Sequence, residues 1–331
     1  MDGLEGGDTM KGVNNFLLFV LVLSFTVLLT GCATVSIRVP FTEPAEIDLK
    51  GIENIAIGDI TGYGGKDLQD ELTQALFESE RFQVLDRQHL DHILTEHELQ
   101  YSGAIDESTA IELGKLIGST AFIFGRVQRY DYNEQESHSR WKDKKTGKTH
   151  INYKRKGVAT VRAFLQVTDT RTGKIIAIKK IERMATATTS ATDRRPQPID
   201  SDALLESARL KVIDTFMRAI APYEVMIGVT FVKVKGVPEI SAGIAFAKHR
   251  QWDLAIESFE KGVETTPYKV KDKAHYNLGI AYMAIGEFNK AKEHLKEAMR
   301  LNPKSKRYAK AFDRCKYLEE ESKKLEEQLK E

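Results

Sequence analysis

The sequence has few of the features on which enzymes depend. Its 331 residues include two cysteines, Cys32 and Cys315, and they supply no closed set of cysteine and histidine ligands for a metal. No serine, histidine and acidic residue stand in a recognisable nucleophile motif. We therefore predict a protein that is not an enzyme and that uses no cofactor and no metal. The length suffices for two domains with separate cores.

A phosphate-binding loop is also missing. Residues 58–66 follow a predicted strand and precede a predicted helix, which is the right setting for such a loop. However, Ile60 stands six residues before Lys66, where the motif requires glycine, and Asp67 replaces the hydroxyl residue that would hold magnesium. The pattern favours a tight strand-to-helix turn.

Three histidines lie close together on one predicted helix, at His89, His92 and His97. Their spacing does not match the zinc-protease pattern, in which two histidines flank a catalytic glutamate. A solvated helix face explains them adequately, and a metal site is the less favoured alternative.

No apolar run is long enough for a typical membrane span of about 20 residues. The apolar run from Phe16 to Leu29 ends at Leu29-Thr30-Gly31-Cys32, and no basic stop-transfer cluster follows. Small residues before a cysteine form a lipobox, whose thiol accepts a diacylglyceryl group before cleavage. We predict a signal peptide over residues 1–31 and a lipid on Cys32. A plain secretory signal and a membrane-spanning helix are the alternatives.

The residues around the signal refine this prediction. Asp2, Glu5 and Asp8 are acidic where a signal is normally positive, whereas Met10 begins a normal amino-terminal region, so we expect translation to start at Met10. Ala33 follows the cysteine in place of the aspartate that retains lipoproteins in the inner membrane of enterobacteria. We therefore expect the periplasmic face of the outer membrane in a host with two membranes, and no contact with nucleic acid.

The segment after the signal predicts a tether followed by a mixed domain. Residues 32–50 show no sustained period and are interpreted as the tether. Residues 51–225 then alternate strands with helices, which is an α+β pattern. The expected strands cover residues 52–60, 81–85 and 121–127, with a hairpin at 158–168 and 174–181; the expected helices cover residues 68–77, 87–99 and 107–117, with a last helix capped by Ser201.

From Gly236 the period is helical and the sequence repeats itself. Trp252, Ala255, Phe259, Gly262 and Pro267 recur as Phe288, Ala291, Leu295, Ala298 and Pro303. The pattern resembles the tetratricopeptide repeat, which has small residues where paired helices touch. We predict two such repeats over residues 236–304, an all-α domain, and a charged capping helix over residues 305–331.

Three segments of the first domain resemble the curli assembly and transport lipoprotein family, or CsgG-like proteins. They cover residues 82–94, 121–127 and 164–176. The resemblance implies an α/β sandwich that also occurs in lipoprotein activators of peptidoglycan synthases, and an anchor on an amino-terminal cysteine. Relatives that secrete curli form an oligomeric pore from extra hairpins, so a homo-oligomer is also implied.

The segments that would form a pore here are unsuited to lipid. Residues 132–156 carry eight lysines and arginines, and residues 184–200 are mostly Ala and Thr before Asp193-Arg194-Arg195. Each Lys or Arg facing the middle of a bilayer costs about 2 to 4 kcal/mol. We therefore expect a member that forms no channel. The basic stretch is either a solvated loop or a contact for anionic headgroups, cell-wall polymer or an acidic partner through Lys144, Lys145 and Lys148.

The repeats supply the other candidate surface, because their groove is typical of peptide recognition. His275, Tyr276 and Lys290 are candidates for its lining. Our leading hypothesis is a scaffold or accessory factor for envelope assembly or secretion that recruits a protein partner through the repeats. A curli-type secretion channel and a peptidoglycan-synthase activator are the alternatives.

Overall fold

The computed structural model describes residues 34–85 and 120–330. They divide into two compact units, which are described separately. The repeat unit comprises residues 34–41 and 225–321, and the sheet unit comprises the described residues of 42–224 with residues 322–330. Within these residues, no helix combines the length and apolar character needed to cross a membrane. Several predictions fall outside the described residues. They concern the signal peptide, the translation start at Met10, the lipid on Cys32, the helices 87–99 and 107–117, and the histidines His89, His92 and His97.

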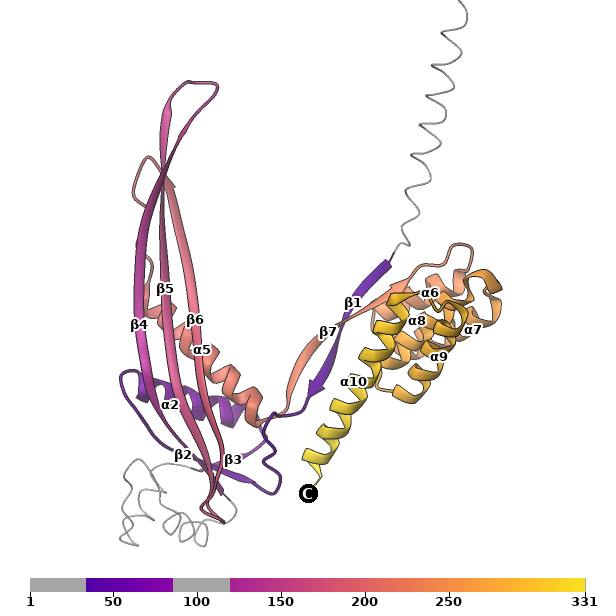
Figure 1. Ribbon diagram of the computed structural model, residues 1–331, viewed down its shortest axis with the longest axis horizontal. Coiled ribbons are helices and arrows are strands. Elements are labelled where there is room, and N and C mark those ends of the chain that lie inside the picture. Colours follow the sequence, from indigo (N-terminus) through magenta and orange to yellow (C-terminus); the bar gives the residue numbers. More distant parts are fainter. Residues whose placement is uncertain (1–33, 86–119, 331) are drawn as a thin grey trace, which may run out of the picture. The chain divides into compact units, whose positions relative to one another are not determined.

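The sheet unit is built on a five-stranded mixed sheet of order β3-β2-β4-β5-β6. Strand β2 pairs in parallel with β3 and β4, whereas β4, β5 and β6 are antiparallel neighbours (Figure 1). The predicted strands are all present, although β3 is shorter and β4 much longer than expected. The strands are β2 (Asn54–Thr61), β3 (Gln83–Val84), β4 (Thr120–Lys142), β5 (Thr149–Asp169) and β6 (Ile175–Thr192).

Two helices cover one face of this sheet and close its core. Helix α2 (Gly65–Glu78) buries Leu68, Leu72 and Leu76, which recur every four residues and so lie on one helical face. Helix α5 (Ser201–Ile220) packs beside it on β5 and β6. Each fully buried leucine contributes about 1.5–3 kcal/mol. The observed mixture of sheet and helices confirms the predicted α+β class.

The cap of α5 differs by one residue from the predicted cap. Asp200, and not Ser201, is the N-cap, and its carboxylate accepts hydrogen bonds from the N–H groups of Asp202 and Ala203 at 3.0 Å. Asp200 has extended backbone angles, as an N-cap requires, so the helix begins only after it.

Beyond the helices, three strands continue as a ribbon that we call the arm, residues 133–142, 149–158 and 184–193. Lys154 pairs with Ser137 on one side and with Ser190 on the other. The composition of residues 184–200 gives no strand signal in the sequence. The first part of this segment nevertheless extends β6 along β5, because β-branched Thr suits a pleated surface and the register with β5 is unbroken from Val167 to Asn152.

A strand replaces most of the predicted tether. Strand β1 (Thr34–Glu43) pairs with β7 (Tyr223–Val232) in a two-stranded sheet. Val39 is buried in the core of the repeat unit, and Val35, Ile37 and Phe41 pack against that core. The tether prediction is therefore wrong over residues 34–43, because these apolar side chains alternate with polar ones and supply one buried face of a strand.

The repeat unit contains two consecutive helix pairs, α6 with α7 and α8 with α9. Small residues allow the close packing: a Cβ on Gly243 would lie 2.6 Å from the Phe259 ring, and one on Gly279 would lie 2.8 Å from Leu295 Cγ. This confirms the predicted helical class. The helices are α6 (Pro238–Lys248), α7 (Trp252–Thr265), α8 (Lys271–Ala284), α9 (Phe288–Leu301) and α10 (Lys306–Leu329), with the 3-10 turn η1 (Tyr268–Val270) before α8.

Candidate functional site: a cationic cavity in the repeat unit

Strand β7 is held against the repeats by side chains that replace a neighbouring strand. The amide of fully buried Asn277 accepts from the N–H of Val232 at 2.8 Å and donates to its carbonyl at 2.7 Å. Tyr276 donates its hydroxyl to the carbonyl of Thr230 at 2.8 Å. Phe231 stacks on Phe259 at 5.3 Å between ring centroids. Residues of α8 therefore satisfy the carbonyl of Thr230 and both backbone groups of Val232 on the outer edge of β7.

A cavity of about 440 Å³ opens beside this contact, between β7, α8 and the first half of α10. Apolar side chains form much of its lining: Val229, Tyr276, Ile280, Met283 and Ala311. Four cations from α10 complete it: Lys306, Arg307, Lys310 and Arg314. Lys306, Lys310 and Arg314 recur every four residues, so they share one face of the helix.

The cavity carries uncompensated positive charge. None of its lining residues is acidic, and across the described parts of the chain none of the four α10 cations forms an ion pair. Burial raises the pKa of Tyr276 to about 12, so this phenol stays neutral. Positive charge beside low-dielectric walls concentrates anions locally. The site is therefore suited to an anionic ligand that also has apolar groups.

Of the three predicted groove residues, the structure places only Tyr276 in this cavity. His275 stacks on His294 at 5.4 Å between ring centroids, with their Nδ1 atoms 3.1 Å apart. Lys290 lies 5.3 Å above the Tyr282 ring. His275 and Lys290 do not line this cavity, and their place in the groove of the repeats stays a prediction. The four-residue spacing of the α10 cations was the signal that could have revealed the site.

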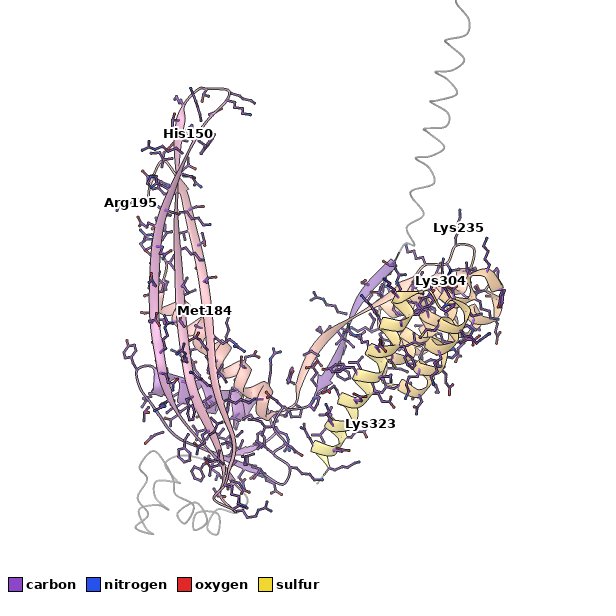
Figure 2. The ribbon with its side chains drawn as sticks, viewed as in Figure 1. His150, Met184, Arg195, Lys235, Lys304 and Lys323 are labelled. Atoms are coloured by element: carbon purple, nitrogen blue, oxygen red, sulfur yellow. The ribbon has the colours of Figure 1, made fainter. Side chains whose placement is uncertain are left out.

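The basic stretch of the arm is less positive than its composition suggested. Arg155 is neutralised across the strands by Glu134 at 3.2 Å and Glu136 at 2.5 Å. Lys144, Lys145 and Lys148 are exposed on the turn that joins β4 to β5. In Figure 2, His150 lies close to the end of the arm and Met184 lies farther down it. His150 contacts Asp193 at 2.6 Å, which fastens β5 to the end of β6.

The turn before α2 has a structural role, as its sequence predicted. Gly62 and Gly64 have positive φ angles, and a Cβ on Gly64 would lie 2.6 Å from the Tyr130 ring. Arg209 holds this region by donating to Glu71 and to the Tyr130 hydroxyl, and its pKa is raised chiefly by the bond to Glu71. Within residues 34–85 and 120–330, no three potential ligands from His, Cys, Asp and Glu come together in a way that could hold a metal ion.

Comparison with known families agrees with this architecture. Residues 48–194 match the family described as curli production assembly/transport component CsgG, and residues 272–305 match the tetratricopeptide repeat. The chain thus carries a CsgG-like domain followed by tetratricopeptide-repeat structure. No curated protein sequence gives a significant match.

Several solved structures are similar in part. The lipoprotein GNA1162 from Neisseria meningitidis is 13% identical, with 50% of this chain and 97% of that chain covered and a TM-score of 0.29. The PelC dodecamer from Paraburkholderia phytofirmans is 12% identical, with 56% and 99% covered and a TM-score of 0.28. The LpoB C-terminal domain from Salmonella enterica is 12% identical, with 40% and 84% covered and a TM-score of 0.26.

Proposed function

We propose that this protein is an envelope lipoprotein, anchored by a lipid on Cys32 to the periplasmic face of the outer membrane, that serves as a scaffold or accessory factor for envelope assembly or secretion. A lipobox, a CsgG-like domain and tetratricopeptide-repeat structure in one chain support this proposal. The cationic cavity is the observation that carries it, because unpaired cations beside apolar side chains form a binding surface. The function is to hold partners and not to catalyse a reaction.

Homo-oligomerisation through the arm belongs to the same proposal. Strand β6 is an edge of the sheet, and its residues from Met184 to Thr192 include no charged side chain. Edge strands normally carry charges that prevent pairing with another chain. An uncharged edge of this length therefore favours lateral pairing between copies of the protein.

A secretion channel is the second candidate, and the length of the arm is what favours it. Exposed Arg140, Lys154 and Lys156 oppose it, because lipid would meet those charges. Activation of a peptidoglycan synthase is a further form of the accessory role. Reproducible single-channel conductance of the purified protein in planar bilayers would establish the channel and overturn the scaffold.

The proposal is tested with the full chain expressed in a bacterium with two membranes. Mass spectrometry should find a diacylglyceryl group on Cys32, and Cys32→Ser should abolish it and release the protein from the outer-membrane fraction. Mass photometry of the detergent-extracted protein then gives the number of copies. A protein that remains unlipidated and cytoplasmic would refute the envelope role.

The partner is sought by crosslinking in cells, with and without removal of the repeat-unit cations. We expect a defined envelope protein to be crosslinked to the repeat unit. If crosslinks form only between copies of this chain, or only from the sheet unit, recruitment through the repeats is wrong.

A further inference from the structure

The cavity of the repeat unit contains an open strand edge as well as cations. Ser36 and Thr230 join their hydroxyls at 2.9 Å across β1 and β7, and the Tyr223 hydroxyl donates to Glu43 at the other end of the ribbon. From the first pair to the second, the residue number rises in β1 and falls in β7, so the two strands are antiparallel. Asn277 and Tyr276 reach the backbone of Val232 and Thr230 from outside the ribbon.

Gly228 is the next residue on that same outer edge. In an antiparallel pair, alternate residues direct both their N–H and their C=O away from the partner strand. Thr230 and Val232 do so toward α8, and Gly228 therefore does so toward the cavity that it lines. Outside the strand ladder, the described residues make no hydrogen bond to the backbone of Gly228.

The lack of a side chain at Gly228 has no explanation within the fold. A Cβ built there would meet nothing within 4 Å, so close packing does not require glycine. Glycine inside a strand weakens it and often marks a place where another backbone approaches closely. Gly228 thus leaves room for a second chain at a part of this edge that borders the cavity, and the described residues give its backbone no hydrogen bond outside the strand ladder.

The charges are spaced for an extended peptide. Residues four apart on α10, such as Lys306, Lys310 and Arg314, are about 6 Å apart along the helix axis. Alternate residues of an extended chain point the same way and are about 6.8 Å apart. Carboxylates at alternate positions of a strand could therefore meet these cations in succession, while the side chains between them face the other way.

We propose that the cavity binds an acidic peptide in extended conformation, which pairs with the backbone of Gly228 and places its carboxylates on the cations of α10. This inference rests on the proposed function and gives the chemistry of the partner. An anionic lipid would satisfy the cations but has no peptide groups to exchange hydrogen bonds with Gly228. A peptide is therefore the occupant that uses both features of the site.

Fluorescence anisotropy of a labelled peptide alternating Glu and Thr, added to the full-length protein in neutral detergent, tests the proposal. We expect saturable binding that weakens as salt is raised, since the contacts are ionic. The same peptide with Gln in place of Glu should not bind. A helix-forming Glu and Ala peptide should bind at least about tenfold more weakly than the extended one, a difference of about 1.4 kcal/mol.

Two variants separate the contributions. The double variant Lys310→Glu, Arg314→Glu should weaken binding at least about tenfold through charge repulsion. The matched control, Lys248→Glu with Lys269→Glu, changes two exposed lysines outside the cavity and should leave binding unchanged. Gly228→Val fills open space and raises strand propensity, so it should fold with an unchanged or higher Tm and yet weaken binding about tenfold. Peptide binding should also slow hydrogen exchange at Gly228.

Each contrary result has a definite meaning. Equal binding by the Glu and Gln peptides, or by the protein and its cavity variants, overturns the proposal. Preference for the helical peptide, or for vesicles of anionic phospholipid, replaces the extended peptide by that ligand. If a crosslinked envelope partner persists in both cavity variants, the scaffold role stands and this site is wrong. If no partner is found while the peptide binds as expected, the site stands and the envelope role is wrong.

Discussion

The arm and the cavity of the repeat unit both display lysine and arginine, but in opposite surroundings. On the arm, Lys144, Lys145 and Lys148 project from an exposed turn, and Arg155 is already neutralised by Glu134 and Glu136. In the cavity, the four cations of α10 lie beside apolar side chains with no acidic residue among the lining. The lysines of the turn and the four cations of α10 are all exposed, so the two regions differ in the neighbours of their charges and not in burial. Cations that have apolar neighbours and no acidic one remain available to an anionic ligand. The count of cations in a segment thus says little about its capacity to bind.

The two regions also differ in how firmly their polar groups are fixed. Asn277 is fully buried and bonds both polar groups of Val232, whereas Asn152 of the arm is half-buried on an open ribbon. The sequence has two tryptophans, Trp141 in the arm and Trp252 in the repeat unit. Single-tryptophan variants therefore report separately on the two regions.

The largest difference should come from replacing these two asparagines by leucine. Asn277→Leu leaves the buried N–H and C=O of Val232 without partners, and each such group costs about 1–3 kcal/mol. We expect a loss of about 3 kcal/mol in the free energy of unfolding reported by Trp252 in urea. Asn152→Leu should change the Trp141 transition by no more than about 0.5 kcal/mol. Similar losses in both would show that Asn277 does not fasten β7 to the repeats.

A smaller contrast should come from adding one methyl group to a glycine in each region. A Cβ on Gly157 of the arm would lie 2.6 Å from the Tyr132 hydroxyl oxygen, so Gly157→Ala should destabilise the arm by about 1–2 kcal/mol. Gly228→Ala enters open space and should stabilise the repeat unit by about 0.5 kcal/mol. Tyr132→Leu should lessen the penalty at Gly157. Destabilisation by both alanines would mean that β7 is already in contact with another group at Gly228.

The smallest contrast is in the response to pH. Burial, and for His275 also the charge of its neighbour, lowers the pKa of both His275 and His294. The unfolded chain then binds protons more readily, so the unfolding free energy of the repeat unit should fall as the pH drops below about 6.5.

The arm should respond only at lower pH. The pKa of Asp193 is lowered by hydrogen bonds, first from the Ile151 N–H and then from His150. Ionised Asp193 therefore stabilises the folded arm above the ordinary aspartate range, and this stabilisation is lost as the pH falls below about 4. Urea titrations between pH 7.5 and 5 should shift the Trp252 transition more than that of Trp141. His294→Gln should flatten the Trp252 response, and an unaltered response would assign it to other groups.

Local patterns predicted the sheet strands and the helix pairs well. The leucines of α2 and the recurring small residues of the repeats carry period and spacing within a short window, which sequence reasoning detects. Asp200 shows the limit at element ends, since it and Ser201 are both good N-caps and only the backbone decides between them.

Pairings between distant segments were harder to predict. The alternation of Val35, Ile37, Val39 and Phe41 is visible in the sequence, but its partner β7 begins at Tyr223, far along the chain. The part of β6 from Met184 onward has no apolar pattern in the sequence. It lies beside β5 because the pairing register set in the core of the sheet continues without a break into the arm. The cavity combines β7, α8 and α10, so none of these segments alone identifies it.

Strand β1 also determines how tension would pass through the molecule. Thr34 begins β1 two positions after Cys32, so a chain held at Cys32 has almost no slack before the ribbon. The antiparallel strands place the start of β1 beside the end of β7, which continues into α6. A pull on the repeats would therefore peel β7 from β1 one hydrogen-bonded pair at a time. A pull on the sheet unit would instead stretch β1 along its covalent backbone, so the ribbon would yield to force from one unit and resist it from the other.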